Sequence, residues 1–317
     1  MGKSQRYLGG RIGQSIPSSG VTSTSSQPAV YDLSGQYYIK KGGGWTHPFV
    51  GTGNIEATGG TTATYSTPTG SYKSHTFTSS GSFQVTGAPS GGDYDAEFWL
   101  QGAGGGTKNN PMGPPGPGGG NREAGSGAGG ALYGPAGDLP VGTYPVTIGG
   151  GGSESNGSNS VFATPSPGPG PHTALGGGAG GAGDPSPDNL GNDGGCGGGG
   201  WYISGNPNKG EGAQPSPHPT VTGLGYDGSD GKSAPEYGGA GGGTAGAGGY
   251  GTANGAGTPN VYRYGPTNAQ TYGVGGESSD YANTNRQAAG GANTGNGSSA
   301  HATGGSGVLV IRYKTSG

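Results

Sequence analysis

Residues 176–183 read GGGAGGAG, and this stretch indicates how a chain so rich in glycine can form an ordered structure. Positions 177, 180 and 183 are glycine, and positions 176, 179 and 182 are glycine, alanine and alanine. In a helix with three residues per turn, two of the three faces would therefore lack bulky side chains. Such helices can pack side by side, with N–H and Cα–H groups donating to carbonyl oxygens of their neighbours. We predict a bundle of polyproline-II helices whose core is backbone.

Similar glycine tracts fill the segment from about residue 102 to residue 307. The others are at 104–106, 118–120, 194–200 and 238–251. A continuous collagen triple helix is excluded, because the glycine period that starts at residues 113–119 (GPPGPGG) fails at Arg122. Proline-rich and aromatic interruptions separate the tracts, and we interpret them as loops gathered at the ends of the bundle.

The composition of the whole chain excludes several classes of protein. Of 317 residues, 84 are glycine and 25 are proline, while 27% are hydrophobic and 10% are charged. A helical bundle is excluded because each glycine in a helix interior costs about 1 kcal/mol relative to alanine. No apolar run approaches the ~20 residues of a membrane span. Residues 1–10 lack the apolar region of a secretory signal peptide, so we expect none.

Short apolar runs on both sides of the glycine segment predict β-strands. Residues 74–85 (SHTFTSSGSFQV) alternate apolar and polar around a Ser-Gly pair, which predicts a hairpin. The most apolar run is 308–313 (VLVIRY), and the strands near 75–100 are its natural partners. Further strands are expected at 95–100, 143–148 and 160–163. Pro145 indicates that the strand at 143–148 lies at a sheet edge.

The predicted fold is therefore mainly β and irregular, with almost no α-helix. A small antiparallel β-sheet or sandwich would close a bundle of glycine-rich polyproline-II helices, all within residues 73–317. Residues 1–72 would form an extended N-terminal arm, because their apolar islands are too short to build a compact core. Residues 1–50 hold five basic residues and one acidic residue, whereas the remainder is acidic overall. This asymmetry suggests a separate partner for the arm.

Motifs for catalysis, metal binding and nucleotide binding fail on inspection. Residues 225–233 (GYDGSDGKS) look like a phosphate-binding loop, but Tyr226 stands where that loop needs glycine. Asp227 and Asp230 lack the remaining ligands of a calcium loop, and the five histidines are in no metal-binding spacing. Cys196 lies in GGCGGGG and is interpreted as a small residue in a tight backbone environment. We expect no enzymatic activity, no cofactor and no metal.

Four pieces of the sequence, taken in order, carry a resemblance to a known family. They are residues 77–85 (FTSSGSFQV), 98–106 (FWLQGAGGG), 140–152 (PVGTYPVTIGGGG) and 304–313 (GGSGVLVIRY). Over about residues 73–317 the chain resembles the glycine-rich domain of tailed bacteriophage fibres and appendages, especially those of cyanobacterial phages. The closing strand is the most specific element, and the proline-rich inserts depart from the pattern. The N-terminal segment, with GRIG at residues 10–13, is similar to leaders of phage structural proteins.

The resemblance implies a virion surface protein, similar to phage tail-tip adhesins whose loops between glycine helices touch the host receptor. The residues expected to dock the arm on the particle are Arg6, Arg11, Lys40, Lys41 and Trp45. The residues expected in outward-facing receptor loops are Trp201, Tyr262, Tyr264 and Tyr272. The alternative for these four rings is that they cover the ends of the bundle or an interface between chains.

The expected partners follow from the same resemblance. They are other virion structural proteins, sister chains in a homo-oligomer that is a trimer by analogy with fibres, and a host cell-surface receptor such as a glycan. We expect no membrane insertion and no nucleic-acid binding, because the N-terminal cations are few and have no stacking aromatics among them. The expected location is the virion surface, after synthesis in the host cytoplasm. Two alternatives stay open: a capsid or neck decoration fibre without a receptor role, and a free polyproline-II protein that binds ice or a polymer surface.

Overall fold

The computed structural model describes residues 30–33, 36–41, 44–46, 55–87, 96–108, 123–136, 139–164, 171–183, 189–201, 207–233, 236–250, 253–278, 288–299 and 302–316. Within these residues the fold is mainly β, as predicted, and its one helical element is the short 3-10 turn η1 (Pro266–Asn268). The strands form two larger antiparallel sheets, of six and five strands, and three small ones. No helix in this part of the chain is long and apolar enough to cross a membrane.

The six-stranded sheet has the C-terminal strand in its interior. Its order is β13 (Thr222–Leu224), β9 (Ala131–Pro135), β8 (Glu97–Gln101), β18 (Val308–Ser316), β6 (Gly70–Phe77) and β5 (Thr61–Thr67). Strand β18 thus pairs with β8 and β6, which confirms the predicted partners near residues 75–100. Leu309 and Ile311 belong to one apolar cluster and Val308 and Val310 to another, on opposite faces of the sheet. Cover on both faces explains why this run is apolar throughout.

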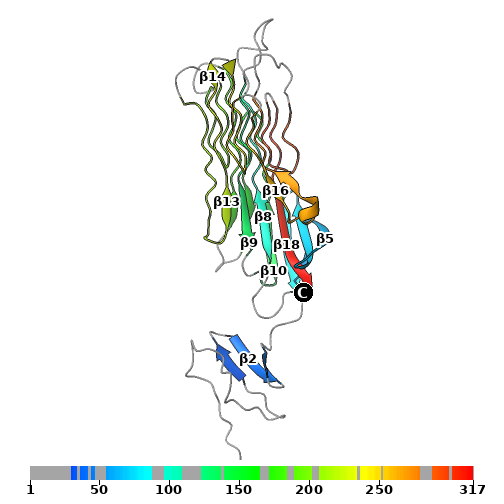
Figure 1. The fold of residues 1–317 in the computed structure, drawn as a ribbon. Helices are drawn as coiled ribbons and strands as arrows, with labels where there is room; N and C mark the ends of the chain where they lie inside the picture. The colour runs from blue at the N-terminus through cyan, green and yellow to red at the C-terminus, as the bar shows by residue number, and fades with distance from the viewer. Residues whose placement is uncertain are drawn as a thin grey trace, which may run out of the picture.

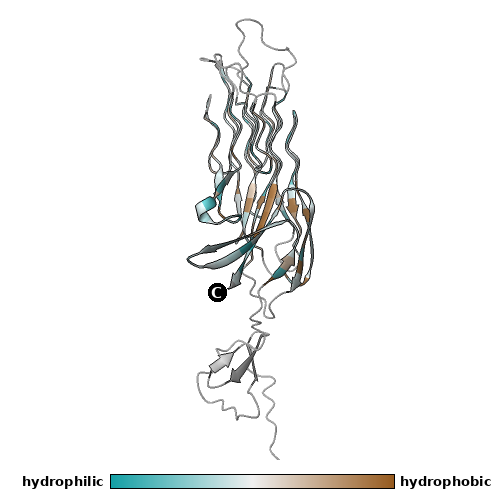
Figure 2. Ribbon diagram, turned by 90° about the vertical axis from the view of Figure 1, so that its right-hand side faces the viewer, coloured by the Kyte–Doolittle hydropathy of each residue, from teal (hydrophilic) through white to brown (hydrophobic). Residues whose placement is uncertain are grey.

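The five-stranded sheet packs against the inner face of the first sheet and completes a β-sandwich. Its order is β12 (His172–Ala174), β11 (Ser160–Phe162), β10 (Gly142–Thr147), β7 (Gly81–Gly87) and β4 (Glu56–Thr58). Side chains from both sheets form one buried cluster, which includes Phe83, Val85, Tyr144, Val146, Phe162, Phe98, Leu100, Leu309 and Ile311. Figure 2 shows that the most hydrophobic ribbon lies in these strands.

Two of the strand predictions need correction. Residues 74–85 do not form a hairpin: β6 and β7 belong to different sheets, and the chain crosses between them at residues 78–80. The reason is that Phe77 and Phe83 enter the same core from opposite sides. Strand β10 is interior rather than an edge, since it pairs with both β7 and β11. Pro145 is tolerated because it lies just beyond the end of β11: its carbonyl accepts a bond from Ala163 N–H, and the one bond that it cannot donate is at the end of the ladder.

The N-terminal boundary also differs from the prediction. Residue 72 falls inside β6, and β4 and β5 belong to the sandwich sheets although they lie in the predicted arm. Further toward the N-terminus, β1 (Val30–Leu33), β2 (Gln36–Lys41) and β3 (Gly44–Thr46) form an antiparallel three-stranded sheet of their own. The arm predicted as extended is therefore folded into strands over part of its length.

Strands of both sheets continue directly into the glycine tracts. The tract at 102–108 follows β8, the tract at 123–130 precedes β9, the tract at 175–183 follows β12, and the tract at 302–307 precedes β18. In Figure 1 these segments run on from the sheet, side by side, toward the end where β14 (Lys232–Ser233) pairs with β15 (Glu236–Tyr237). The sandwich and the glycine tracts thus form one elongated body.

Backbone hydrogen bonds hold the glycine tracts together with a period of three residues. In the tract at 123–130, N–H groups donate to three neighbouring tracts in turn, over 2.8–3.2 Å. Ala124, Gly127 and Gly130 donate to residues 181, 178 and 175; Gly125 and Ala128 donate to residues 239 and 242; Ser126 and Gly129 donate to residues 298 and 295. A helix with three residues per turn produces this pattern. The backbone core predicted from residues 176–183 is therefore present.

The interior of this bundle has no space for a side chain at many of its glycines. A Cβ atom on Gly199 would collide with the carbonyl oxygen of Gly239, and one on Gly105 with the carbonyl oxygen of Gly178. At Gly150, on the surface, an added Cβ would meet nothing within 4 Å. In the bundle interior, glycine is required where one backbone lies against another.

Polar side chains complete the hydrogen bonding at the sides of the bundle. Asn156 Oδ1 accepts a bond from Ala179 N–H at 2.9 Å, and Asn159 Oδ1 accepts one from Gly176 N–H at 2.8 Å. Asp227 Oδ1 accepts a bond from Gly212 N–H at 2.9 Å. These oxygens take the place of the carbonyl groups that a further helix would supply.

Candidate functional site

The predicted receptor loop around Tyr262 and Tyr264 lies against the sandwich. It joins β16 (Thr258–Asn260) to β17 (Gln270–Tyr272), and this hairpin packs on the outer face of the six-stranded sheet near β18 and β5 (Figure 1). The Tyr65 hydroxyl donates to the Tyr262 carbonyl at 3.0 Å, and Ser74 Oγ donates to the Arg263 carbonyl at 2.8 Å. The hairpin is thereby fixed to strands β5 and β6.

The four aromatic residues predicted to face outward differ in exposure. Tyr272 is 1% exposed and packs with Trp99 and Val310 in the outer apolar cluster, and Trp201 is 8% exposed. For these two rings the prediction of an outward orientation is wrong, because both rings are buried. Tyr262 is half-buried, and Tyr264 is 36% exposed. Of these four predicted residues, only Tyr262 and Tyr264 in the hairpin loop can contact a partner.

Arg312 stands at the centre of the contact between hairpin and sheet. Its Nε and Nη2 atoms donate to Glu97 Oε2 at 2.7 and 2.6 Å, and its Nη1 donates to the Tyr65 hydroxyl at 3.3 Å. The guanidinium carbon lies 3.9 Å from the ring centroid of Tyr262 and 5.0 Å from that of Tyr72. Two aromatic rings and a carboxylate thus enclose one cation, an arrangement that stabilises a partly buried charge.

The hydroxyl groups at this position stay protonated at neutral pH. Burial, and then the negative charge of Glu97, raise the pKa of Tyr262 to about 12. Burial also raises the pKa of Tyr65 above its usual value of 10.0. Both groups therefore remain hydrogen-bond donors.

Next to Glu97 the same face of the sheet carries a pair of stacked rings. Tyr133 on β9 lies opposite Trp99 on β8, with ring centroids 5.5 Å apart and planes inclined by 16°. Trp99 is 3% exposed, whereas Tyr133 and Leu224 on β13 are half-buried. We call the set Leu224, Tyr133, Glu97 and Tyr262 the Tyr133 surface.

Sequence reasoning missed Tyr133, Glu97 and Arg312. One signal was available: Arg312 interrupts the otherwise apolar run at 308–313, and a cation within a buried strand needs a partner. Nothing local in the sequence pairs it with Glu97, 215 positions away. Only the register of β18 on β8, in which Arg312 lies opposite Glu97, joins them.

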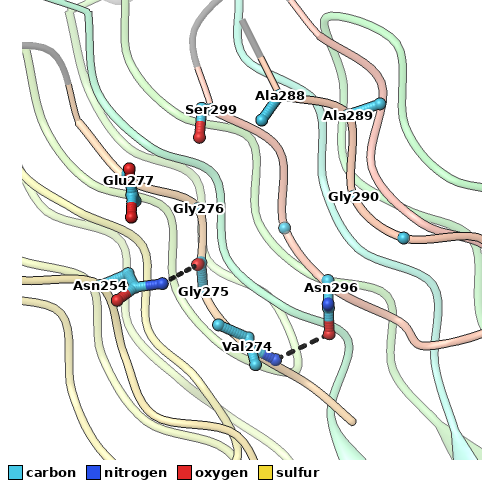
Figure 3. A pocket seen from close by; sticks show the side chains of 12 residues that line it. Asn254, Val274, Gly275, Gly276, Glu277, Ala288, Ala289, Gly290, Asn296 and Ser299 are labelled. Atoms are coloured by element: carbon cyan, nitrogen blue, oxygen red, sulfur yellow. Dashed lines mark hydrogen bonds between the residues drawn. The ribbon is translucent and has the colours of Figure 1, made fainter. Parts of the chain in front are cut away.

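A second feature is a hollow of about 220 Å³ in the side of the glycine bundle (Figure 3). It lies among the tracts 274–277, 288–291 and 296–299. Asn254 Nδ2 donates to the Gly275 carbonyl at 3.2 Å, and Asn296 Oδ1 accepts from Val274 N–H at 2.9 Å. Glu277 is the one ionisable residue in its lining. Because Asn254 and Asn296 already bond to the backbone of its walls, the hollow is a gap in the helix packing.

Three other titratable groups, on His172, Cys196 and His75, are buried in packed parts of the protein. Burial lowers the pKa of His172 to about 4 and raises that of Cys196 to about 12, so the imidazole is neutral and the thiol unreactive at neutral pH. His75 Nδ1 bonds to the Gly59 carbonyl at 2.7 Å, and its Nε2 bonds to the Tyr313 hydroxyl at 3.0 Å, inside the sandwich. No group of three or more His, Cys, Asp or Glu residues within the described ranges could hold a metal ion.

Three of the five predicted docking residues lie in the N-terminal sheet. Lys40 and Lys41 end β2, and Lys40 pairs in register with Trp45 on β3. The hairpin thereby brings the three residues together in the backbone. Arg6 and Arg11 lie outside the described residues.

No protein-family model matches the chain, and no curated protein does either. The function must therefore be argued from the sequence and the geometry. Among the described side chains, those on the outer face of the six-stranded sheet combine partial exposure, aromatic rings and a carboxylate in one place. Such a combination is suited to binding.

Proposed function

We propose that the chain is a structural subunit of a bacteriophage virion, a fibre or adhesin-type appendage that docks by its N-terminus and contacts the host surface. The observation that carries the proposal is the continuity between sandwich and bundle. Strands such as β8 and β18 run on into glycine helices that are bonded to several neighbours every third residue. Because each helix is tied on several sides, the body resists bending along its length. A stiff, elongated body is suited to project from the surface of a particle.

The perturbed titratable groups agree with a structural and binding role. His75 and His172 lie in the sandwich core, and Cys196 lies in the glycine bundle. The pKa values of all three are shifted mainly by burial, rather than by a second catalytic group at an open site. Their surroundings are those of packed interiors.

A capsid or neck decoration fibre without a receptor role is the second candidate. The burial of Trp201 and Tyr272 favours it, because two of the four rings assigned to receptor contact instead cover the protein's own interior. The position on the particle separates the two candidates, since a tail tip meets the host and a capsid or neck fibre need not.

The test is to label phage particles with antibodies against the purified chain and to examine them by electron microscopy. We expect a label at one defined position: the tail tip indicates an adhesin, and the capsid or neck indicates a decoration fibre. Particles that carry no label would overturn the virion assignment. In a phage that encodes the chain without residues 1–50, we expect the label to disappear. Label that persists would show that docking does not use the N-terminus.

A second measurement tests the role in attachment. Purified chain added to host cells before the phage should slow adsorption, because it occupies the same receptors. Adsorption at an unchanged rate, together with a label on the capsid or neck, would establish the decoration fibre. Thermal hysteresis in a solution of the purified chain would instead establish the ice-binding alternative.

A further inference from the structure

We propose that the Tyr133 surface binds a saccharide, an inference that rests on the proposed role in host attachment and names the chemical class of the receptor. The surface combines one stacked aromatic ring, one carboxylate, one tyrosine hydroxyl and one aliphatic side chain on three adjacent strands and the hairpin loop. A sugar ring presents C–H groups on its faces and hydroxyl groups around its rim. The aromatic ring and the aliphatic side chain match the C–H groups, and the carboxylate and the tyrosine hydroxyl match the sugar hydroxyl groups.

The aromatic part is Tyr133. Its ring is supported from beneath by the nearly parallel ring of Trp99, which is almost completely buried. Tyr133 is therefore held in one orientation on a strand, while it remains half-exposed. A rigid ring gives a large contact area at little cost in conformational entropy, and the C–H face of a pyranose can stack on it.

The polar part is Glu97. Both bonds from Arg312 end on the same oxygen, Oε2, so the guanidinium holds the carboxylate without using Oε1. The Glu97 side chain is 35% exposed. The Tyr262 side chain also hydrogen-bonds to this carboxylate. The remaining lone pairs of the carboxylate can accept a hydrogen bond from a sugar hydroxyl, and bonds to an ionised acceptor are stronger than those between neutral groups. The Tyr262 hydroxyl, which stays protonated, lies on the same side of the sheet.

The hairpin determines where this surface lies. Its loop is bonded to β5 and β6, and Tyr262 covers Arg312 on β18. Over β8, β9 and β13, Glu97, Tyr133 and Leu224 keep partial exposure. Leu224 is the one aliphatic member, so the surface is too polar for the apolar core of a protein interface. Because its groups are fixed by strand register and ring stacking, little entropy is lost on binding.

The experiment uses the full chain and an array of bacterial surface oligosaccharides, including O-antigen and capsule fragments. We expect binding to at least one member, and a Kd for that oligosaccharide measurable by calorimetric titration. Tyr133→Leu removes the ring and hydroxyl but keeps apolar cover on Trp99, and Glu97→Gln removes the charge. Both should weaken binding at least tenfold. Tyr250→Leu is the matched control, since Tyr250 is 55% exposed in the glycine bundle, and it should bind as the unmodified chain does.

Thermal unfolding of each variant separates lost binding from lost folding. If Tyr133→Leu does not fold, Leu224→Arg on the edge strand β13 tests the same surface by placing a bulky charge beside it. The proposal is overturned if no oligosaccharide binds the unmodified chain, or if the folded variants bind as tightly as the control. In that case labelled virions would still support the virion role. If an oligosaccharide binds but particles carry no label, the proposed binding surface would be supported and the virion role would be overturned.

Discussion

The sandwich and the glycine bundle are parts of one continuous body, but they have opposite kinds of interior. In the sandwich, side chains such as Phe98, Leu100 and Phe162 are fully buried, and the removal of apolar area from water stabilises the fold at about 25 cal/mol per Å². In the bundle, buried residues are mainly glycine, and the contacts are backbone hydrogen bonds and close backbone packing. Each such bond contributes only about 1 kcal/mol net, so the bundle depends on their number.

This difference predicts opposite sensitivities. The sandwich interior should be damaged most by the loss of side-chain volume, because it leaves a cavity. The bundle interior has no side-chain volume to lose at its glycines, so it should be damaged by the gain of a single methyl group. The two regions can therefore be distinguished by the direction of the substitution.

The largest effect is expected from Phe98→Ala in the sandwich. Phe98 is fully buried, with its ring centroid 4.4 Å from that of His172 and 6.0 Å from that of Phe162. Removing the ring should lower the free energy of unfolding by about 3–5 kcal/mol, as for other buried aromatic truncations. Denaturant titration followed by circular dichroism measures it. A loss below about 1 kcal/mol would show that the sandwich core is not what stabilises this region.

The matching change in the bundle is Gly199→Ala. The added methyl would collide with the Gly239 carbonyl, while Gly199 N–H donates to Gly125 and its carbonyl accepts from Gly181. We expect a loss of roughly 3 kcal/mol, at the upper end for overpacked interiors, because all the surrounding atoms are backbone.

Gly150→Ala is the control for this substitution. Gly150 is exposed, and an added Cβ would meet nothing within 4 Å. Its effect on the free energy of unfolding should stay within about 0.5 kcal/mol. Equal losses in the two glycine variants would mean that glycine serves chain flexibility in this protein, not packing.

The bundle could be predicted from sequence because its rule is local. The three-residue period in residues 176–183 needs no knowledge of distant residues, and the apolar run at 308–313 likewise identified a strand. The hairpin predicted at residues 74–85 failed because local alternation cannot tell one sheet from its partner across a shared core. The edge position predicted from Pro145 failed for a similar reason, because the cost of a proline in a strand depends here on where the neighbouring strand β11 ends.

The candidate site was less accessible to sequence reasoning. Tyr262 and Tyr264 were identified from an aromatic loop, but the burial of Tyr272 and Trp201 depends on packing that no spacing reveals. The pairing of Glu97 with Arg312 depends on strand register across most of the chain. Structure that follows from a short sequence period could be predicted from the sequence, whereas contacts that depend on long-range strand pairing could not.

A smaller effect is expected from pH, and in the sandwich it arises from buried histidines. The pKa of His172 is about 4 in the folded protein and 6.5 in an exposed imidazole, so the unfolded chain binds a proton more readily between these values. The contribution of His172 to stability is complete above about pH 6.5 and should fall by about 2 kcal/mol by pH 5, as the unfolded state becomes protonated. The lowered pKa of His75 acts in the same direction. Denaturant titrations at pH 8 and pH 5 measure the change.

His172→Phe isolates the contribution of this residue. Burial raises the pKa of Glu123 to about 7, which gives the opposite dependence over the same range, so the unmodified chain alone reports a sum. Neither ring nitrogen of His172 has a hydrogen-bond partner among the described residues, and phenylalanine should fill the site without that penalty. We expect the variant to be at least as stable at pH 8 and to lose less stability by pH 5. An identical pH dependence in both proteins would assign the effect to other groups.

The smallest effect tests whether side chains at the side of the bundle replace a missing helix. Asn156 Oδ1 accepts bonds from Ala179 N–H and from Asn192 Nδ2, and its Nδ2 donates to the Asp193 carbonyl. The exposed Asn156 covers the buried Ala179, so Asn156→Ala opens the Ala179 N–H to water, and the loss should be about 1 kcal/mol. Hydrogen exchange measured by NMR should show faster exchange at the Ala179 amide, while the Gly199 amide in the interior keeps its protection. Faster exchange at both amides would mean that the bundle opens as one unit, and that its side is as important to cohesion as its interior.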